Sequence, residues 1–119
     1  MLTHRLPNET VLSIIDAVQA VVPRDARAAV FLCGARADVH ARGGGLDLWV
    51  LCEHEENVEP GWARLIRRRL EDALGPQKID ILVTGPIDQV ADRGKRAFLE
   101  QIDEKKVELW RKSPRPSSS

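Results

Sequence analysis

The chain has 119 residues, 43% of them hydrophobic, which is enough for one compact core and too few for two ordinary domains. Its 18 Lys and Arg residues equal its 18 Asp and Glu residues, which excludes the bulk positive charge that drives sequence-independent nucleic-acid binding. No apolar run reaches the roughly 18 residues that cross a bilayer, and the first residues lack a signal peptide's apolar centre, so we expect a cytoplasmic protein without a membrane partner.

The first half of the chain predicts one helix followed by two strands. Apolar residues at helical spacing predict a helix over residues 9–22, ended by Pro23. Short apolar runs predict strands over residues 28–33 and 46–52. The polar, glycine-rich segment between these strands, residues 35–45, predicts a loop.

The second half predicts helix, strand and helix. A helix is expected to begin near Asn57 or Pro60 and to end at Gly75, and a strand covers residues 78–84. A helix that contains Phe98 follows, and residues 107–110 form either a closing strand or an extension of that helix. We expect an α+β domain over residues 1–112, with a small mixed sheet flanked by helices, and a disordered tail over residues 113–119.

Two further features have alternative interpretations. Cys33 and Cys52 lie in apolar runs without metal-ligand spacing, which favours reduced core thiols over a disulfide framework. The run Arg67, Arg68 and Arg69 favours a solvated helix face, with a phosphate-facing patch as the alternative.

Each of two predicted strands carries one carboxylate in apolar surroundings. Alternation places Asp47 on one strand face with Trp49, and Asp80 on one face with Leu82. Burial of an unpaired carboxylate is costly, so such residues usually face solvent, pair with a cation or bind metal. We predict that both carboxylates lie on one sheet face, where they would bind Mg²⁺; the alternative is that each accepts hydrogen bonds from loop amides.

The segment VFLCGARADVHARGGGLDLWV resembles the signature of the minimal nucleotidyltransferases of the polymerase-beta-like superfamily. In that family a strand ends in Gly-Ser or Gly-Gly, often followed by Arg. After a loop come two acidic residues that alternate with hydrophobic ones, and a third acidic residue lies in a later strand. By resemblance, Gly34, Ala35 and Arg36 bind the nucleotide, while Asp47 and Asp80 are catalytic and bind Mg²⁺. The resemblance therefore implies a polymerase-beta-like nucleotidyltransferase fold and a nucleoside triphosphate substrate.

Two positions depart from the family pattern. Gly45 stands where the family has its first metal-binding carboxylate, and Ala35 stands where it has a serine. A missing ligand in a two-metal site removes several kcal/mol of charge stabilisation, and about 1.4 kcal/mol is a tenfold change in rate. Asp38 or Glu53 would restore the set only if the backbone brought one inward; otherwise each is a solvated charge.

Loop residues His40 and Arg42 either face phosphate or are solvated. The sequence thus predicts a nucleotidyltransferase-domain protein with weak or absent transfer activity. The resemblance also implies an alternative, an antitoxin that binds and blocks or modifies a HEPN-like toxin. The oligomeric state and the acceptor substrate do not follow from the sequence.

Overall fold

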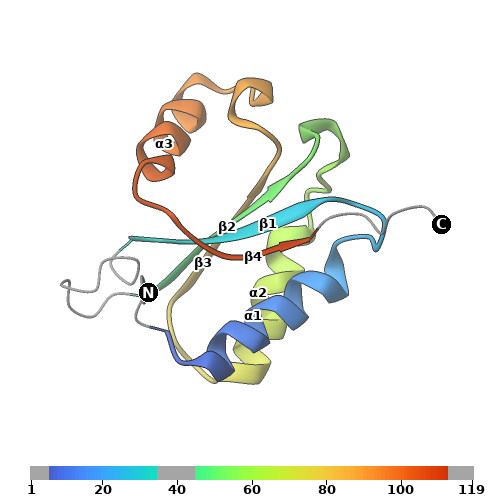
Figure 1. Ribbon diagram of the computed structural model, residues 1–119, viewed down its shortest axis with the longest axis vertical. Coiled ribbons are helices and arrows are strands. Elements are labelled where there is room, and N and C mark those ends of the chain that lie inside the picture. Colours follow the sequence, from blue (N-terminus) through green and yellow to red (C-terminus); the bar gives the residue numbers. More distant parts are fainter. Residues whose placement is uncertain (1–5, 35–44, 113–119) are drawn as a thin grey trace.

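The protein is described here by a computed structural model, which describes residues 6–34 and 45–112. A four-stranded sheet separates two helical layers (Figure 1). The elements in chain order are α1 (Asn8–Val21), β1 (Ala28–Cys33), β2 (Leu46–Cys52), the 3-10 helix η2 (Glu55–Asn57), α2 (Trp62–Leu74), β3 (Ile79–Thr84), the 3-10 helix η3 (Ile87–Gln89), α3 (Arg93–Asp103) and β4 (Val107–Lys112). The closing segment is therefore a strand rather than a helix extension.

The sheet is mixed, with strand order β3-β2-β1-β4. β1 pairs antiparallel with both β2 and β4, whereas β2 pairs parallel with β3, which follows it through α2. The predicted α+β class, with a small mixed sheet and flanking helices, is confirmed.

Helices α1 and α2 cover one face of the sheet, and α3 lies on the other (Figure 1). The α1 and α2 face holds the larger core, in which Ile14 of α1 and Ile66 of α2 are fully buried against Leu48 and Val50 of β2. The opposite face holds a smaller core of Ala29, Phe31, Cys33, Trp49, Val90 and Leu99. The alternation predicted for β2 is therefore confirmed, because its even-numbered residues face one core and Trp49 faces the other.

Local sequence explains where each helix ends. α1 stops at Val21, two residues before Pro23, which lacks the amide to continue a helix. α2 stops at Gly75, whose positive φ of 83° favours glycine. At the start of α3, the Asp92 side chain accepts a hydrogen bond from the Gly94 amide at 3.3 Å.

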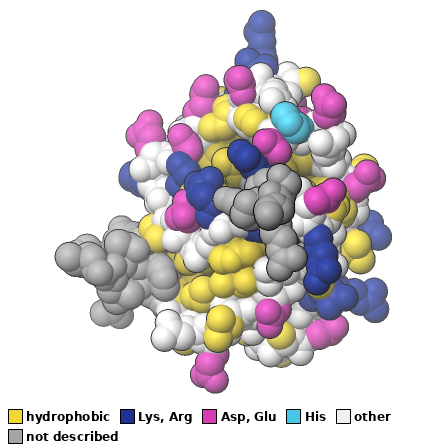
Figure 2. Space-filling view, turned by 45° about the vertical axis from the view of Figure 1, so that its right-hand side comes forward, with side chains coloured by type: hydrophobic (Ala, Val, Ile, Leu, Met, Phe, Trp, Pro, Cys, Tyr) yellow, Lys and Arg dark blue, Asp and Glu magenta, His cyan; other side chains and the backbone are white. Residues whose placement is uncertain are grey.

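Both cysteines are buried and free, as predicted, and they lie in different cores, Cys33 on the α3 side and Cys52 on the other. The predicted loop over residues 35–45 lies outside the described residues except for Gly45, and so does the predicted disordered tail. None of the helices in the described part of the chain has the length and apolar character needed to span a bilayer. Basic and acidic side chains are interspersed over the face shown in Figure 2.

Candidate functional site

The candidate site is built on a pair of aspartates from neighbouring strands. Asp47 is the second residue of β2, Asp80 is the second residue of β3, and the parallel register places them directly opposite each other. Both side chains line one pocket, so the prediction that they lie on adjacent strands and one sheet face is confirmed. Among the described residues, backbone amides that donate to side chains donate to Glu55, Gln89 and Asp92, and the loop residues 35–44, whose amides the alternative interpretation invokes, lie outside the described part of the chain.

The pair carries more negative charge than its surroundings neutralise. Burial raises the pKa of Asp47 above its usual value, the charge of Asp80 and a hydrogen bond with Asp80 raise it further, and Lys78 opposes the rise. The Lys78 Nζ atom lies 3.9 Å from Asp80 Oδ2, and both side chains are mostly exposed, so this ion pair is weak. A shared proton or a bound cation would relieve the repulsion between the two carboxylates.

Gly34, directly after β1, lies against the Asp47 carboxylate. Its φ of 71° is in the region that favours glycine. A Cβ atom at this position would overlap Asp47 Oδ2 and would lie 3.1 Å from Asp47 Cγ. Glycine is therefore required twice, for the turn and for the close approach of the chain to the carboxylate. The neighbouring nucleotide-binding predictions, Ala35 and Arg36, lie outside the described residues, as do His40 and Arg42.

The pocket around the pair has a volume of about 430 Å³, within the usual range for small-molecule sites. Its charged lining residues are Asp47, Asp80 and Arg67. Its apolar lining residues are Leu48, Ile81, Leu82, Phe98 and Ile102, of which Leu82 and Ile102 also pack against the smaller core on the α3 side.

The sequence named Arg67 only within the arginine run, with a phosphate-facing patch as the alternative, and it named Phe98 only as part of a helix; both residues line the pocket. Arg67 belongs to α2, which packs beside the edge strand β3, and its exposed side chain reaches the pocket. Arg68 and Arg69 are exposed and do not line it. The prediction of a solvated face thus holds for those two residues and is incomplete for Arg67. Leu99, the neighbour of Phe98, fills the core position of α3, which leaves the Phe98 side chain exposed.

No acidic residue in the described part of the chain completes the family's carboxylate set. A Cβ atom at Gly45 would lie 2.7 Å from the Lys78 carbonyl oxygen and 3.0 Å from Lys78 Cβ, so no space is free for a side chain there. Glu53 follows the far end of β2, about 20 Å along the strand from Asp47. It pairs with Arg27 at 3.8 Å, so the idea that Glu53 completes the site is wrong. Asp38 lies outside the described residues.

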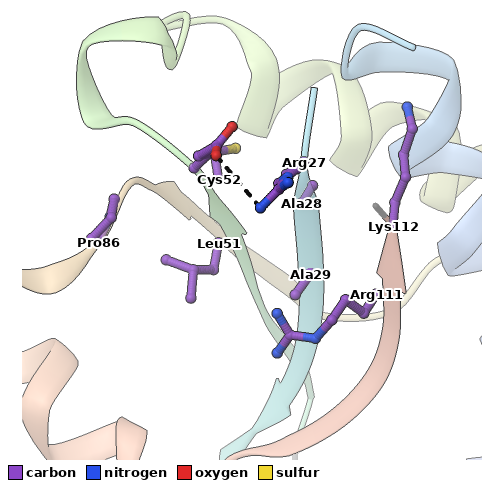
Figure 3. Close-up of a pocket in the computed structure, with 9 residues that line it drawn as sticks. Arg27, Ala28, Ala29, Leu51, Cys52, Pro86, Arg111 and Lys112 are labelled. Carbon is purple, nitrogen blue, oxygen red and sulfur yellow. Dashed lines mark ion pairs between the residues drawn. The ribbon is translucent and has the colours of Figure 1, made fainter. Parts of the chain in front are cut away.

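A second cavity, of about 340 Å³, lies at that far end of β2 (Figure 3). Three cationic side chains line it, but each already has a partner. Arg27 pairs with Glu53, the Arg111 guanidinium donates to Glu108 at 2.7 and 3.1 Å, and Lys112 Nζ donates to a backbone carbonyl at 2.9 Å. This cavity has no paired carboxylates, so the pocket at Asp47 and Asp80 is the stronger candidate.

Comparison with solved structures identifies the fold. The chain is similar to a chain in the crystal structure of a mutant of the toxin-antitoxin pair MntA-HpeT, with a TM-score of 0.57, 16% identity, and coverage of 84% of this chain and 71% of that one. This protein has a nucleotidyltransferase-like fold. At this identity the likeness concerns the fold alone, and it confirms the fold expected from the sequence. Neither a protein-family model nor a curated protein matches the sequence.

Proposed function

We propose that this nucleotidyltransferase-like domain binds a nucleoside triphosphate together with Mg²⁺ and that its nucleotidyl transfer is weak or absent. The observation that carries the proposal is the pair Asp47 and Asp80, placed opposite each other at the wall of a nucleotide-sized pocket. Burial first, and then the charge of Asp80, raises the pKa of Asp47, and a bound cation would offset both effects.

The donor set fits one Mg²⁺ ion rather than two. Mg²⁺ prefers hard oxygen ligands and commonly takes one or two protein carboxylates, with substrate phosphates and water in its remaining positions. Within the described residues, no group of three or more His, Cys, Asp and Glu side chains could hold a metal. Bound Mg²⁺ would neutralise phosphate charge, and Asp47 and Asp80 would hold it.

The remaining polar groups of the pocket suit the phosphates. The Arg67 guanidinium carries permanent positive charge and planar donors that match phosphate oxygens. The turn at Gly34 brings the backbone within reach of the same space, and by resemblance the Ala35 amide and the Arg36 side chain add further contacts.

Position 45 is the reason that transfer should be weak. The crystal structure of the MntA-HpeT mutant replaces two aspartates, two positions apart, by glutamate. The same spacing in this chain separates Gly45 from Asp47, so only the second of two such positions carries a carboxylate. Loss of a metal ligand lowers charge stabilisation in the transition state more than it lowers ground-state binding.

Calorimetric titration of the full chain with ATP, with and without Mg²⁺, tests the proposal. We expect Mg²⁺-dependent binding that Asp80→Asn weakens at least tenfold, and little or no transfer of labelled nucleotide to candidate acceptors. The matched control is Asp103→Asn, an aspartate that does not line the pocket. Robust transfer by the wild type, or ATP binding that is indifferent to Mg²⁺ and to Asp80→Asn, would contradict the proposal.

A second candidate function is that of an antitoxin which binds a HEPN-like helical toxin. The similar solved structure belongs to a toxin-antitoxin pair, which supports this candidate. The neighbouring helices α1 and α2 also expose Leu12 and Leu65, which are 60% and 51% exposed. Co-expression with a HEPN-like protein encoded by an adjacent gene should yield a stable complex and relieve toxicity. Unchanged toxicity and no co-purification would reject this candidate.

A further inference from the structure

We infer that apolar lining residues of the pocket form a nucleobase-binding wall, in which the base stacks on the Phe98 ring and contacts Ile102 and Leu82. The inference rests on the proposed function, because the phosphates of the same nucleotide would lie at Asp47 and Asp80. It goes beyond that function by naming where the base binds and which side chains hold it.

Phe98 is an exposed aromatic residue that the fold does not need. Its side chain is 52% exposed, whereas the adjacent Leu99 is fully buried and anchors α3 on the sheet. Ile102 and Leu82 pack partly against that smaller core, and Phe98 is not among the residues that do. Ligand pockets are lined mainly by hydrophobic and aromatic side chains, so an exposed ring at a pocket wall is suited to ligand contact.

The wall continues directly from the carboxylate pair. Leu82 lies two residues after Asp80 on β3, which places it on the same sheet face about 7 Å farther along the strand. Phe98 and Ile102 are four residues apart on α3, so they lie on one face of that helix, and both line the pocket. A single ligand can therefore contact both the charged and the apolar lining residues.

The chemistry of the wall fits the face of a base rather than its edge. Among the described lining residues, the charged side chains are Asp47, Asp80 and Arg67, and the side chains of Leu82, Phe98 and Ile102 are hydrocarbon. Aromatic side chains stack on any base because every base has a π face, whereas discrimination between bases requires polar groups at the base edge. We therefore expect ATP, GTP, CTP and UTP to bind with similar affinities.

The test compares Mg²⁺-ATP with Mg²⁺-tripolyphosphate, which has the phosphates and no base. By calorimetry on the full chain, Phe98→Ala should weaken ATP binding about tenfold and leave tripolyphosphate binding unchanged. Phe98→Trp should retain or improve ATP affinity, because the larger ring still stacks. The matched control is Leu65→Ala, which removes another half-exposed apolar side chain that does not line the pocket.

The outcomes separate this inference from the proposed function. Tripolyphosphate binding as tight as ATP binding, or equal effects of Phe98→Ala on both ligands, would overturn the base wall and leave the carboxylate site standing. Binding of adenosine that depends on Phe98, without any Mg²⁺ or tripolyphosphate binding, would support the wall and reject the proposed function. Absence of both ATP and adenosine binding would overturn the wall. Sedimentation showing a dimer that Phe98→Ala dissociates would also overturn it, because the ring would then contact a second copy.

Discussion

Replacement of Gly34 by alanine should destabilise the protein through its contact with Asp47. An alanine at φ 71° costs about 1–2 kcal/mol because the left-handed region crowds its Cβ atom. The same Cβ atom would overlap the Asp47 carboxylate, and a contact of this kind contributes roughly 1–2 kcal/mol of coupling energy. The free energy of unfolding should therefore fall by about 2–4 kcal/mol, and since about 4 °C corresponds to 1 kcal/mol at this chain length, Tm should fall by roughly 8–16 °C.

A double-mutant cycle separates the two causes. Urea unfolding is measured for the wild type, Gly34→Ala, Asp47→Ala and the double variant at one pH. In the Asp47→Ala background, Gly34→Ala should cost only the backbone share, about 1–2 kcal/mol. Gly75→Ala is the matched control, because Gly75 also has positive φ, at 83°, and no atom lies within 4 Å of its would-be Cβ. An equal cost of Gly34→Ala in both backgrounds would refute the contact between Gly34 and the carboxylate.

Three further predictions concern the same sheet. Because the folded-state pKa of Asp47 lies above the ordinary 3.8, its ionisation destabilises the fold as pH rises through that window. Asp47→Asn should thus raise the free energy of unfolding by about 0.2–1 kcal/mol at pH 7 and leave it unchanged below pH 3.8. Urea midpoints measured across pH test this, and a stabilisation that does not vary with pH would contradict the repulsion. Thr84→Val should cost about 1–3 kcal/mol because it leaves a buried indole N–H without its acceptor, whereas Thr84→Ser should not. Gly45→Asp should lower Tm because Lys78 occupies the space for a side chain, whereas Gly61→Asp, at an open position, should not. Equal Tm values for the two variants would show that Lys78 moves aside at little cost in stability.

The strands and the carboxylate pair were predictable because their signals are local. β1 and β2 have the predicted bounds, since each is an apolar run of strand length that ends where polar or glycine residues begin. Alternation has a period of two, so it assigns Asp47 and Asp80 to strand faces without any knowledge of packing. Alternation does not give the pairing register of β2 and β3. The structure shows that the two carboxylates lie directly opposite each other.

The start of α2 was predicted too early, and the 3-10 helix before it makes long-range contacts. The sequence indicated a start near Asn57 or Pro60, but the helix begins at Trp62, after the 3-10 helix η2. The Glu55 amide donates to Gln89 at 2.9 Å, and the Glu55 carboxylate accepts from the Gly85 amide at 2.6 Å. These partners are 34 and 30 residues away, so a local pattern contains no sign of them.

The sequence named Arg67 and Phe98 but did not place them at the site, for a related reason. Each becomes a site residue only when a helix docks on the sheet, α2 beside β3 and α3 over the opposite face. Helical periodicity identifies the buried stripe of each helix, and both residues lie off that stripe. Their position relative to the carboxylate pair therefore depends on tertiary packing.

Position 45 shows what a sequence pattern can and cannot say about a lost site. The pattern reports a missing carboxylate two residues before Asp47, and on that basis Gly45→Asp together with Ala35→Ser would restore the family pattern. In the structure the Leu46 amide donates to the Lys78 carbonyl at 2.8 Å, and that carbonyl lies where a side chain at position 45 would begin. Restoration thus requires movement of the chain before β3 as well as a new carboxylate. The absence of a carboxylate at position 45 is therefore tied to the packing of two segments rather than to one residue, and a new carboxylate there should cost stability before it can hold a metal.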